Sequence, residues 1–165
     1  MKTSPRRIRR RGPGEVAARC AEFEAQCRSR GVRLTAQRLA VYRALAEDPG
    51  HPTADSVYAR VRAHLATLSQ ATVYRILESL EREGLVRRVS TTDAVARFDA
   101  NLSPHQHLVC RVCGRMADWF APALAAARLP RERVPGFVVE ELDIRLLGRC
   151  AGCRGPTPES PRRRK

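Results

Sequence analysis

The chain has 165 residues, enough for one ordinary domain or two small ones, and its 31 Lys and Arg residues against 17 Asp and Glu residues give a net charge of +14. Residues 1–14 contribute +6 and residues 154–165 contribute +4, so both ends are basic tails and the body carries only about +4. No stretch approaches the roughly 18 apolar residues that cross a membrane, and no apolar segment follows the N-terminal arginines as in an export signal. These features predict a cytoplasmic protein without a membrane span, whose body mildly attracts polyanions.

The first predicted helix runs from Glu15 to about Ser29 and ends near Gly31, because apolar residues recur there at helical spacing. Cys20 and Cys27 belong to this apolar set, and their spacing of seven residues gives them the same helix face. We expect both thiols to be buried core groups rather than redox-active ones. The tails before and after the body are interpreted as disordered segments or as auxiliary contacts to phosphates.

Three further helices are predicted by residues that can cap their first turns, namely Thr35, Thr53 and Ser69. Gly84 is expected to end the last of them. Two helices joined by a short turn, the second opening with small polar residues, are typical of a helix-turn-helix. A hairpin is predicted directly afterwards, from residues 85–90 and 95–98 with a polar turn at 91–93, and it would be the wing of a winged helix.

The character of the sequence changes after Asn101, where short apolar runs are separated by an alanine-rich helix near residues 122–128. The runs cover residues 107–112, 116–120, 137–139 and 144–147. This pattern indicates a small α/β domain. We therefore expect an α+β protein with a winged-helix domain at residues 15–98 and a dimerisation and metal-binding domain at residues 101–153.

Four of the six cysteines form two Cys-x-x-Cys pairs, Cys110 with Cys113 and Cys150 with Cys153. Each pair can offer two thiolates to one ion from a tight turn, and four thiolates suit tetrahedral Zn²⁺ without an open position. In a reducing compartment this arrangement points to metal rather than to disulfides. A redox pair would need only one such motif, at a strand-to-helix junction. We expect a structural zinc ion that fastens the last strand of the second domain to its first.

His105 and His107 share one face of a predicted strand, because side chains alternate along a strand. Asp99 precedes them by six residues, and Asp118 follows beyond the first cysteine turn. Two imidazoles and two carboxylates this close in sequence can bind one metal ion, but surface residues or hydrogen-bonded residues give the same pattern. Spacing alone leaves both interpretations open.

The helix that begins after Ser69 presents hydroxyl, amide, aromatic and guanidinium groups on the turns that would enter a DNA major groove. The candidates for contact with DNA are Ser69, Gln70, Thr72, Tyr74 and Arg75. Tyr74 and Arg75 are the strongest, because the apolar stripe of Val73, Ile76, Leu77 and Leu80 faces the core. A polar helix face can also be merely solvated, but the predicted wing and the positive charge favour DNA.

Four segments resemble, in order, signature segments of the ferric uptake regulator family: residues 51–58 (HPTADSVY), 69–75 (SQATVYR), 97–99 (RFD) and 105–114 (HQHLVCRVCG). The resemblance runs from about residue 31 to residue 153 and leaves only the basic tails outside it. Within the family the pattern is similar to that of the peroxide-sensing repressors.

This resemblance implies a regulatory metal site made of three histidines and two aspartates, at the matching positions His51, Asp99, His105, His107 and Asp118. Such a site suits Fe²⁺ or Mn²⁺, and five ligands can leave a sixth position open to a small oxidant. Asp118 occupies a position where many iron-sensing relatives have glutamate, which favours the peroxide interpretation. The resemblance also implies that peroxide oxidises His51 or His105.

The sequence therefore predicts a metal-dependent, DNA-binding transcriptional repressor, not an enzyme, and a homodimer, because helix-turn-helix proteins usually read two half-sites related by symmetry. An iron, zinc or nickel uptake regulator of the same family is the nearest alternative. A non-haem iron enzyme would use similar ligands, but two small cores leave little room for a substrate pocket. A purely structural zinc protein that binds other proteins would leave His51 and the wing unexplained.

Overall fold

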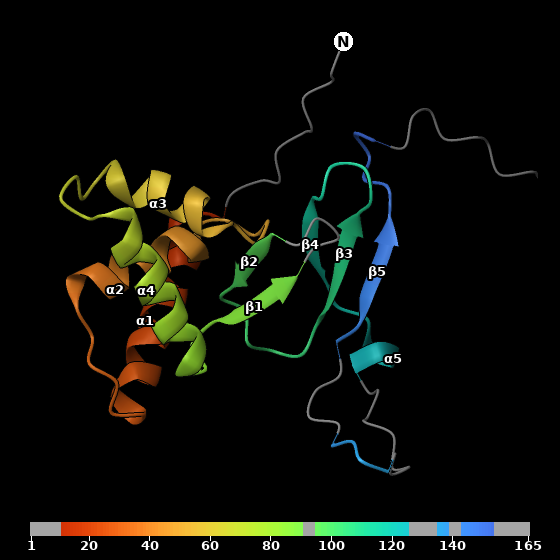
Figure 1. Ribbon diagram of the computed structural model, residues 1–165, viewed down its shortest axis with the longest axis horizontal. Helices are drawn as coiled ribbons and strands as arrows, with labels where there is room; N and C mark the ends of the chain where they lie inside the picture. Colours follow the sequence, from red (N-terminus) through yellow and green to blue (C-terminus); the bar gives the residue numbers. More distant parts are fainter. Residues whose placement is uncertain (1–10, 91–94, 126–134, 139–142, 154–165) are drawn as a thin grey trace, which may run out of the picture.

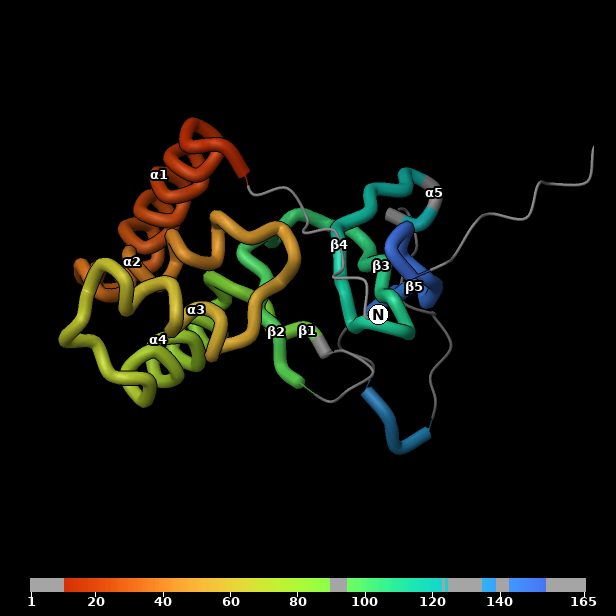
Figure 2. Tube along the Cα trace, turned by 90° about the horizontal axis from the view of Figure 1, so that it is seen from above, coloured from red at the N-terminus to blue at the C-terminus, as the bar shows by residue number. Residues whose placement is uncertain are grey.

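The computed structural model describes residues 11–90, 95–125, 135–138 and 143–153. Four helices come first, followed by a two-stranded hairpin and then a three-stranded sheet with one short helix. In Figure 1 the helices gather on one side and the three-stranded sheet on the other, with the hairpin between them, and Figure 2 shows the same order from above. The tails at residues 1–10 and 154–165 and the expected hairpin turn at residues 91–94 lie outside the described residues.

The helices are α1 (Pro13–Ser29), α2 (Ala36–Ala46), α3 (Ala54–Arg62) and α4 (Gln70–Arg82). The predicted caps are confirmed, since the side chains of Thr35, Thr53 and Ser69 each accept the backbone N–H three residues later at 3.2 Å. Helix α1 begins two residues before the expected Glu15. Pro13 is tolerated in the first turn, where its missing N–H would have had no partner.

The predicted end of the fourth helix at Gly84 is confirmed by its backbone. Gly84 has a φ of +65°, its N–H donates to Glu81 O, and the N–H of Leu85 donates to Leu80 O. This pair of bonds is the Schellman arrangement, which needs a residue in the left-handed region. The guanidinium of Arg30 donates to Gly84 O at 2.9 Å, so the end of α1 also holds the end of α4.

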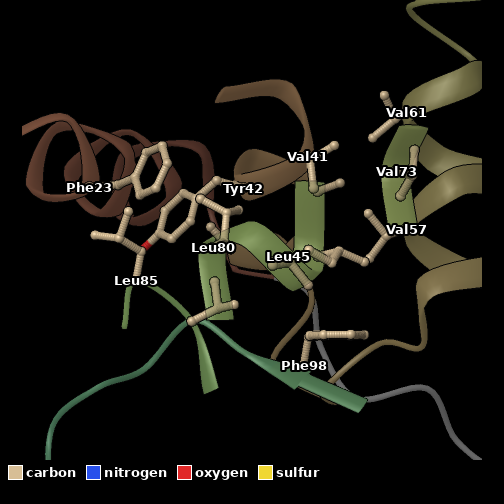
Figure 3. Packing of buried hydrophobic residues seen from close by; sticks show 14 of the residues in the cluster. Phe23, Val41, Tyr42, Leu45, Val57, Val61, Val73, Leu80, Leu85 and Phe98 are labelled. Atoms are coloured by element: carbon tan, nitrogen blue, oxygen red, sulfur yellow. The ribbon is translucent and has the colours of Figure 1, made fainter. Parts of the chain in front are cut away.

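The main hydrophobic core lies among the four helices and is closed by the hairpin (Figure 3). The rings of Phe23 and Tyr42 stack with centroids 4.0 Å apart, and Phe98 of the hairpin is 4% exposed. Cys20 and Cys27 are buried in this core as expected, and burial raises the pKa of both thiols. Each large apolar side chain buried in this way contributes on the order of 1.5–3 kcal/mol to folding.

The hairpin consists of β1 (Arg87–Ser90) and β2 (Ala96–Asp99), which pair in antiparallel register, and this confirms the predicted wing. It is tied to the segment between α2 and α3, because the N–H of Phe98 donates to Pro52 O at 3.1 Å and Thr53 bridges to Arg97. The wing is therefore fixed to the helical unit at the end from which the chain leaves for the second sheet.

The second sheet has the order β4-β3-β5. Strand β3 (Gln106–Cys110) pairs antiparallel with β4 (Met116–Trp119) and parallel with β5 (Arg145–Gly148), and α5 (Pro122–Ala125) follows β4. Three of the four apolar runs are therefore strands. In the run at 137–139, the two described residues are exposed and belong to no strand, and the expected continuation of α5 to residue 128 lies outside the described residues. Among the described helices, none combines the length and apolar character that a membrane span requires.

Candidate metal centres

The four cysteines of the two pairs meet at one end of the second sheet. Cys110 ends β3, and a tight turn closed by Gly114 N–H to Cys110 O brings Cys113 back beside it. Strand β5 runs parallel to β3 and its end lies opposite Cys110, so the chain delivers Cys150 and Cys153 to the same place. The parallel pairing thus converts two distant sequence motifs into one cluster.

The geometry of this cluster fits zinc. One ligand atom from each cysteine lies within 4.8 Å of all the others, and Cys113 Sγ is 3.7 Å from Cys150 Sγ. Four sulfurs about 2.3 Å from a central Zn²⁺ in tetrahedral array are about 3.8 Å apart. All six cysteines are free thiols, so none of these pairs is a disulfide.

The pKa values of the thiols indicate how a cation would change the charge of this cluster. Burial raises the pKa of Cys110, but backbone N–H groups of Cys150 and Cys113 outweigh it and lower this pKa to about 6. The neighbouring sulfurs of Cys113 and Cys150 raise the pKa of Cys153 to about 12. Without a cation the four thiols cannot all ionise together, whereas a divalent ion would stabilise all four thiolates.

The second cluster gathers side chains from both halves of the chain. His51 lies between α2 and α3, Asp99 ends β2, His105 precedes β3, and His107 on β3 lies opposite Asp118 on β4. One ligand atom from each of the five lies within 4.8 Å of all the others. The structure therefore brings together all five residues named by the resemblance.

The ligand atoms of this cluster point at a common centre. His51 Nε2 is 2.9 Å from Asp118 Oδ1, His105 Nε2 is 3.1 Å from Asp99 Oδ2, and His105 Nε2 is 3.0 Å from His107 Nε2. Two nitrogens bound at right angles about 2.1 Å from one ion are about 3.0 Å apart. His105 Nδ1 lies 2.7 Å from Ser103 O, and because a carbonyl only accepts, this nitrogen carries the proton and leaves Nε2 free to bind a metal.

Burial and missing hydrogen bonds distinguish this cluster from an ordinary polar network. His51 is 2% exposed and Asp99 is 4% exposed. Among the residues that the structure describes, both ring nitrogens of His51, together with Asp99 Oδ2 and Asp118 Oδ1, make no hydrogen bond, although His51 Nε2 and Asp118 Oδ1 lie only 2.9 Å apart. Buried polar atoms without partners are costly, and a metal ion would satisfy them. Three nitrogens and two oxygens fit Fe²⁺ or Mn²⁺.

Backbone strain adds a second sign of function at His51. Its φ is +54°, and His51 is the one residue other than glycine with a positive φ in the described ranges. Such a conformation costs on the order of 1–3 kcal/mol and persists where the surroundings enforce it. The guanidinium of Arg97 donates to His51 O at 3.2 Å, so the strand that ends at Asp99 also fixes the backbone of His51.

The metal affinity of this cluster is expected to depend on pH. Burial lowers the pKa of His51, but the carboxylates of Asp118 and Asp99 outweigh it and raise the pKa to about 9. At pH 7 the metal-free imidazole therefore carries a proton that an ion must displace. Mn²⁺ affinity should rise by about tenfold per pH unit between pH 6.5 and 8.5, with at least one proton released per ion. Isothermal titration in buffers of different ionisation enthalpy measures both quantities, and affinity independent of pH would contradict a charged His51.

The helix face predicted to contact DNA is partly engaged in internal bonds. Ser69, Gln70, Tyr74 and Arg75 are exposed, while Thr72 is half-buried. The hydroxyls of Ser69 and Thr72 lie 2.8 Å apart at the cap of α4. Gln70 and the hydroxyl of Tyr74 both donate to Asp55 Oδ1 of α3, at 2.8 and 2.9 Å. These bonds fix α4 against α3 and orient its exposed side chains.

A sequence model of the ferric uptake regulator family matches residues 29–147 of this chain. The chain belongs to the ferric uptake regulator family. Within that family, the peroxide operon regulator of Bacillus subtilis (strain 168) is 36% identical over 123 residues, which cover 74% of this chain and 85% of that protein. The peroxide-responsive repressor PerR of Staphylococcus epidermidis is 33% identical over 133 residues, which cover 81% of this chain and 89% of that protein.

Solved structures of ferric uptake regulator family proteins share this fold. The ferric uptake regulator from Pseudomonas aeruginosa with manganese superposes with a TM-score of 0.62 at 25% identity, covering 78% of this chain and 98% of that one. A zinc uptake regulator complexed with zinc and DNA superposes with a TM-score of 0.60 at 26% identity, and the match covers 82% of this chain and 93% of that one. The predicted fold class, a winged helix followed by a small α/β unit, is confirmed.

Sequence reasoning missed three residues that surround the His/Asp cluster. In the sequence, Arg97 stands out only as part of a signature segment, and Asn101 only as the start of a new region. Arg11 falls in a basic tail, yet its side chain is 11% exposed and its Nη2 lies 3.8 Å from Asp118 Oδ2. The short interval between Asp99 and His105 could have pointed to Asn101, because a residue in that loop must lie near both of these ligands.

Proposed function

We propose that this chain is a metal-dependent, DNA-binding transcriptional repressor that senses peroxide through a regulatory Fe²⁺ or Mn²⁺ site. The observation that carries the proposal is the convergence of His51, Asp99, His105, His107 and Asp118 in one cluster, in which several buried ligand atoms make no hydrogen bond. The names of the curated relatives, a peroxide operon regulator and a peroxide-responsive repressor, support it. When bound, iron would supply the redox chemistry with hydrogen peroxide that manganese lacks.

The proposed metal ion would couple two parts of the chain. We assign a winged-helix domain to residues 15–98 and a dimerisation and metal-binding domain to residues 101–153, between basic tails. His51 belongs to the first domain, Asp99 ends its wing, and the other three ligands lie in or beside the second sheet. An ion bound by all five would therefore favour one arrangement of the two domains. The free energy of that preference equals the difference between the ion's binding free energies in the alternative arrangements.

The structural zinc site is proposed to stabilise the second domain. Cys110, Cys113, Cys150 and Cys153 would hold Zn²⁺ where β3 and β5 end, away from the regulatory ligands. Leu108 is 42% exposed and pairs with the half-buried Leu146, so both lie on one face of this sheet, and a second copy of the chain would cover that face in a homodimer. The dimer would present two copies of α4 to successive half-sites of double-stranded DNA.

Substitutions on α4 test the DNA contact. Tyr74→Ala and Arg75→Ala are each expected to weaken binding to a DNA site selected from a random pool by about 1–3 kcal/mol, because each would remove a contact with bases. Fluorescence anisotropy at fixed salt measures the loss. Arg28→Ala is the matched control, since Arg28 is an exposed arginine on α1, outside the helix-turn-helix. Equal losses in Arg75→Ala and Arg28→Ala would indicate only a general effect of charge, and unchanged affinity in Tyr74→Ala would contradict a base contact by Tyr74.

A metal-uptake regulator of the same family is the second candidate, and the zinc uptake regulator among the structural neighbours favours it. The two candidates differ in their response to peroxide. DNA affinity should be measured for the protein loaded with Fe²⁺, Mn²⁺ or Zn²⁺, before and after peroxide. A peroxide sensor loses DNA binding only in the Fe²⁺ form, whereas an uptake regulator responds to the concentration of its own metal and not to peroxide.

A further inference from the structure

One residue holds both aspartates of the His/Asp cluster. Asn101 lies in the loop from β2 to β3, where its backbone N–H donates to Asp99 Oδ1 at 2.7 Å and its side-chain Nδ2 donates to Asp118 Oδ2 at 3.1 Å. The other oxygen of each carboxylate is buried and has no hydrogen-bond partner within the described ranges. Those two free oxygens are the ones that approach the imidazole nitrogens most closely. Each carboxylate therefore has one oxygen engaged by Asn101 and one that faces the cluster.

Asn101 is itself fixed in this orientation. It is 7% exposed, and its Oδ1 accepts the N–H of Ser103 at 3.3 Å, so its amide nitrogen must point to Asp118. The Arg11 guanidinium also lies near this oxygen, with Nη2 3.8 Å from Asp118 Oδ2 and Nη1 donating to Ala46 O at 3.0 Å. One hydrogen-bond donor, the amide of Asn101, and one nearby positive charge therefore compete with a metal ion for this carboxylate oxygen.

We propose that Asn101, assisted by Arg11, is a positioning residue that keeps Asp118 a one-oxygen ligand of the regulatory metal. The amide occupies Oδ2 and leaves Oδ1 for the ion, while the backbone N–H does the same for Asp99. The cluster then offers five ligand atoms, three nitrogens and two oxygens. A carboxylate that lacked this donor could turn and bind through both oxygens, which would fill the position that a small oxidant needs. This inference rests on the proposed function and names the residue that keeps the site open.

The test compares crystal structures of the full chain loaded with Mn²⁺, together with the rate at which peroxide inactivates the Fe²⁺ form. Asn101→Leu has a similar size and retains the backbone N–H, so Asp99 keeps its donor and only Asp118 loses one. The unaltered protein should show one Asp118 oxygen bound to Mn²⁺, and the variant should show two. Peroxide should inactivate the Fe²⁺ form of the variant about tenfold more slowly, or slower still. Arg11→Gln should shift the coordination of Asp118 and the inactivation rate in the same direction as Asn101→Leu, but by smaller amounts. Ser103→Ala, an exposed side chain of the same loop, should change neither.

Two results would overturn the positioning role: two bound Asp118 oxygens in the unaltered protein, or one bound oxygen and an unchanged rate in Asn101→Leu. If Asn101→Leu does not fold, Asn101→Ser makes the same comparison, because its hydroxyl is too short to reach Asp118. Mn²⁺ absent from the cluster of the unaltered protein would overturn the proposed function and this inference with it. Mn²⁺ present with Asp118 unchanged in the variants would overturn the inference alone.

Discussion

The Fe²⁺-loaded protein is expected to lose DNA binding after treatment with hydrogen peroxide and to gain the mass of one oxygen atom on a tryptic peptide that contains His51 or His105. One oxygen of the peroxide enters an imidazole C–H bond and the other leaves as water, so the net change is a single added oxygen. The altered ring no longer binds the ion as before. A change from 99% to 1% in the binding-competent form requires the loss of roughly 5.5 kcal/mol of stabilisation.

The tryptic map contains its own control. Residues 44–60 include His51 as their only histidine, residues 98–111 include His105 and His107, and residues 63–75 include the exposed His64. Fragmentation within residues 98–111 separates the two histidines of that peptide. The Mn²⁺ form should neither gain mass nor lose DNA binding. Oxidation of His64 to the same extent would contradict a reaction directed by the site, and equal loss of DNA binding with both metals would implicate the zinc thiolates instead.

Cys113→Ser is expected to release the structural zinc, unfold the second sheet and dissociate the dimer. In this sheet β3 pairs with two short strands, and its parallel partner β5 is followed at once by Cys150. Zinc bound by four thiolates contributes about 10–16 kcal/mol in small domains, more than so short a sheet can replace. Zinc content by elemental mass spectrometry, together with mass in solution by sedimentation, measures the effect.

The matched control for this variant is Cys20→Ala, which removes a thiol from the helical core. That substitution should cost about 1 kcal/mol of folding free energy through lost packing and should leave zinc content and dimerisation unchanged. A stable, zinc-free dimer formed by Cys113→Ser would refute the structural role of the four cysteines.

The features that sequence predicted best are those decided within a few residues. Thr35, Thr53 and Ser69 cap their helices because a short side-chain oxygen reaches an N–H three residues away, whatever the remainder of the fold does. Gly84 ends α4 for a similarly local reason, since a left-handed backbone favours glycine. The two cysteine pairs were also identifiable, because metal-binding turns have a characteristic spacing.

The features that sequence could not give depend on contacts between distant segments. His51 joins the second cluster only because the wing packs against the segment between α2 and α3, and that contact was known beforehand solely through family resemblance. The hydrogen bonds of Asn101 depend on the loop path and on the register of β4 against β3. Phe137 belongs to an apolar run of the kind that forms strands, yet it is exposed and lies outside the sheet.

We propose that an ion in the cluster of His51, Asp99, His105, His107 and Asp118 controls DNA binding. The most direct test is to measure Mn²⁺ affinity of the zinc-loaded protein with and without its selected DNA site, and DNA affinity with and without Mn²⁺. Thermodynamic linkage requires that DNA changes the Mn²⁺ affinity by the same factor by which Mn²⁺ changes the DNA affinity. We expect DNA to tighten Mn²⁺ binding by more than about tenfold, a coupling above about 1.4 kcal/mol, and Mn²⁺ to tighten DNA binding by the same factor. Mn²⁺ affinity that is equal with and without DNA would contradict it.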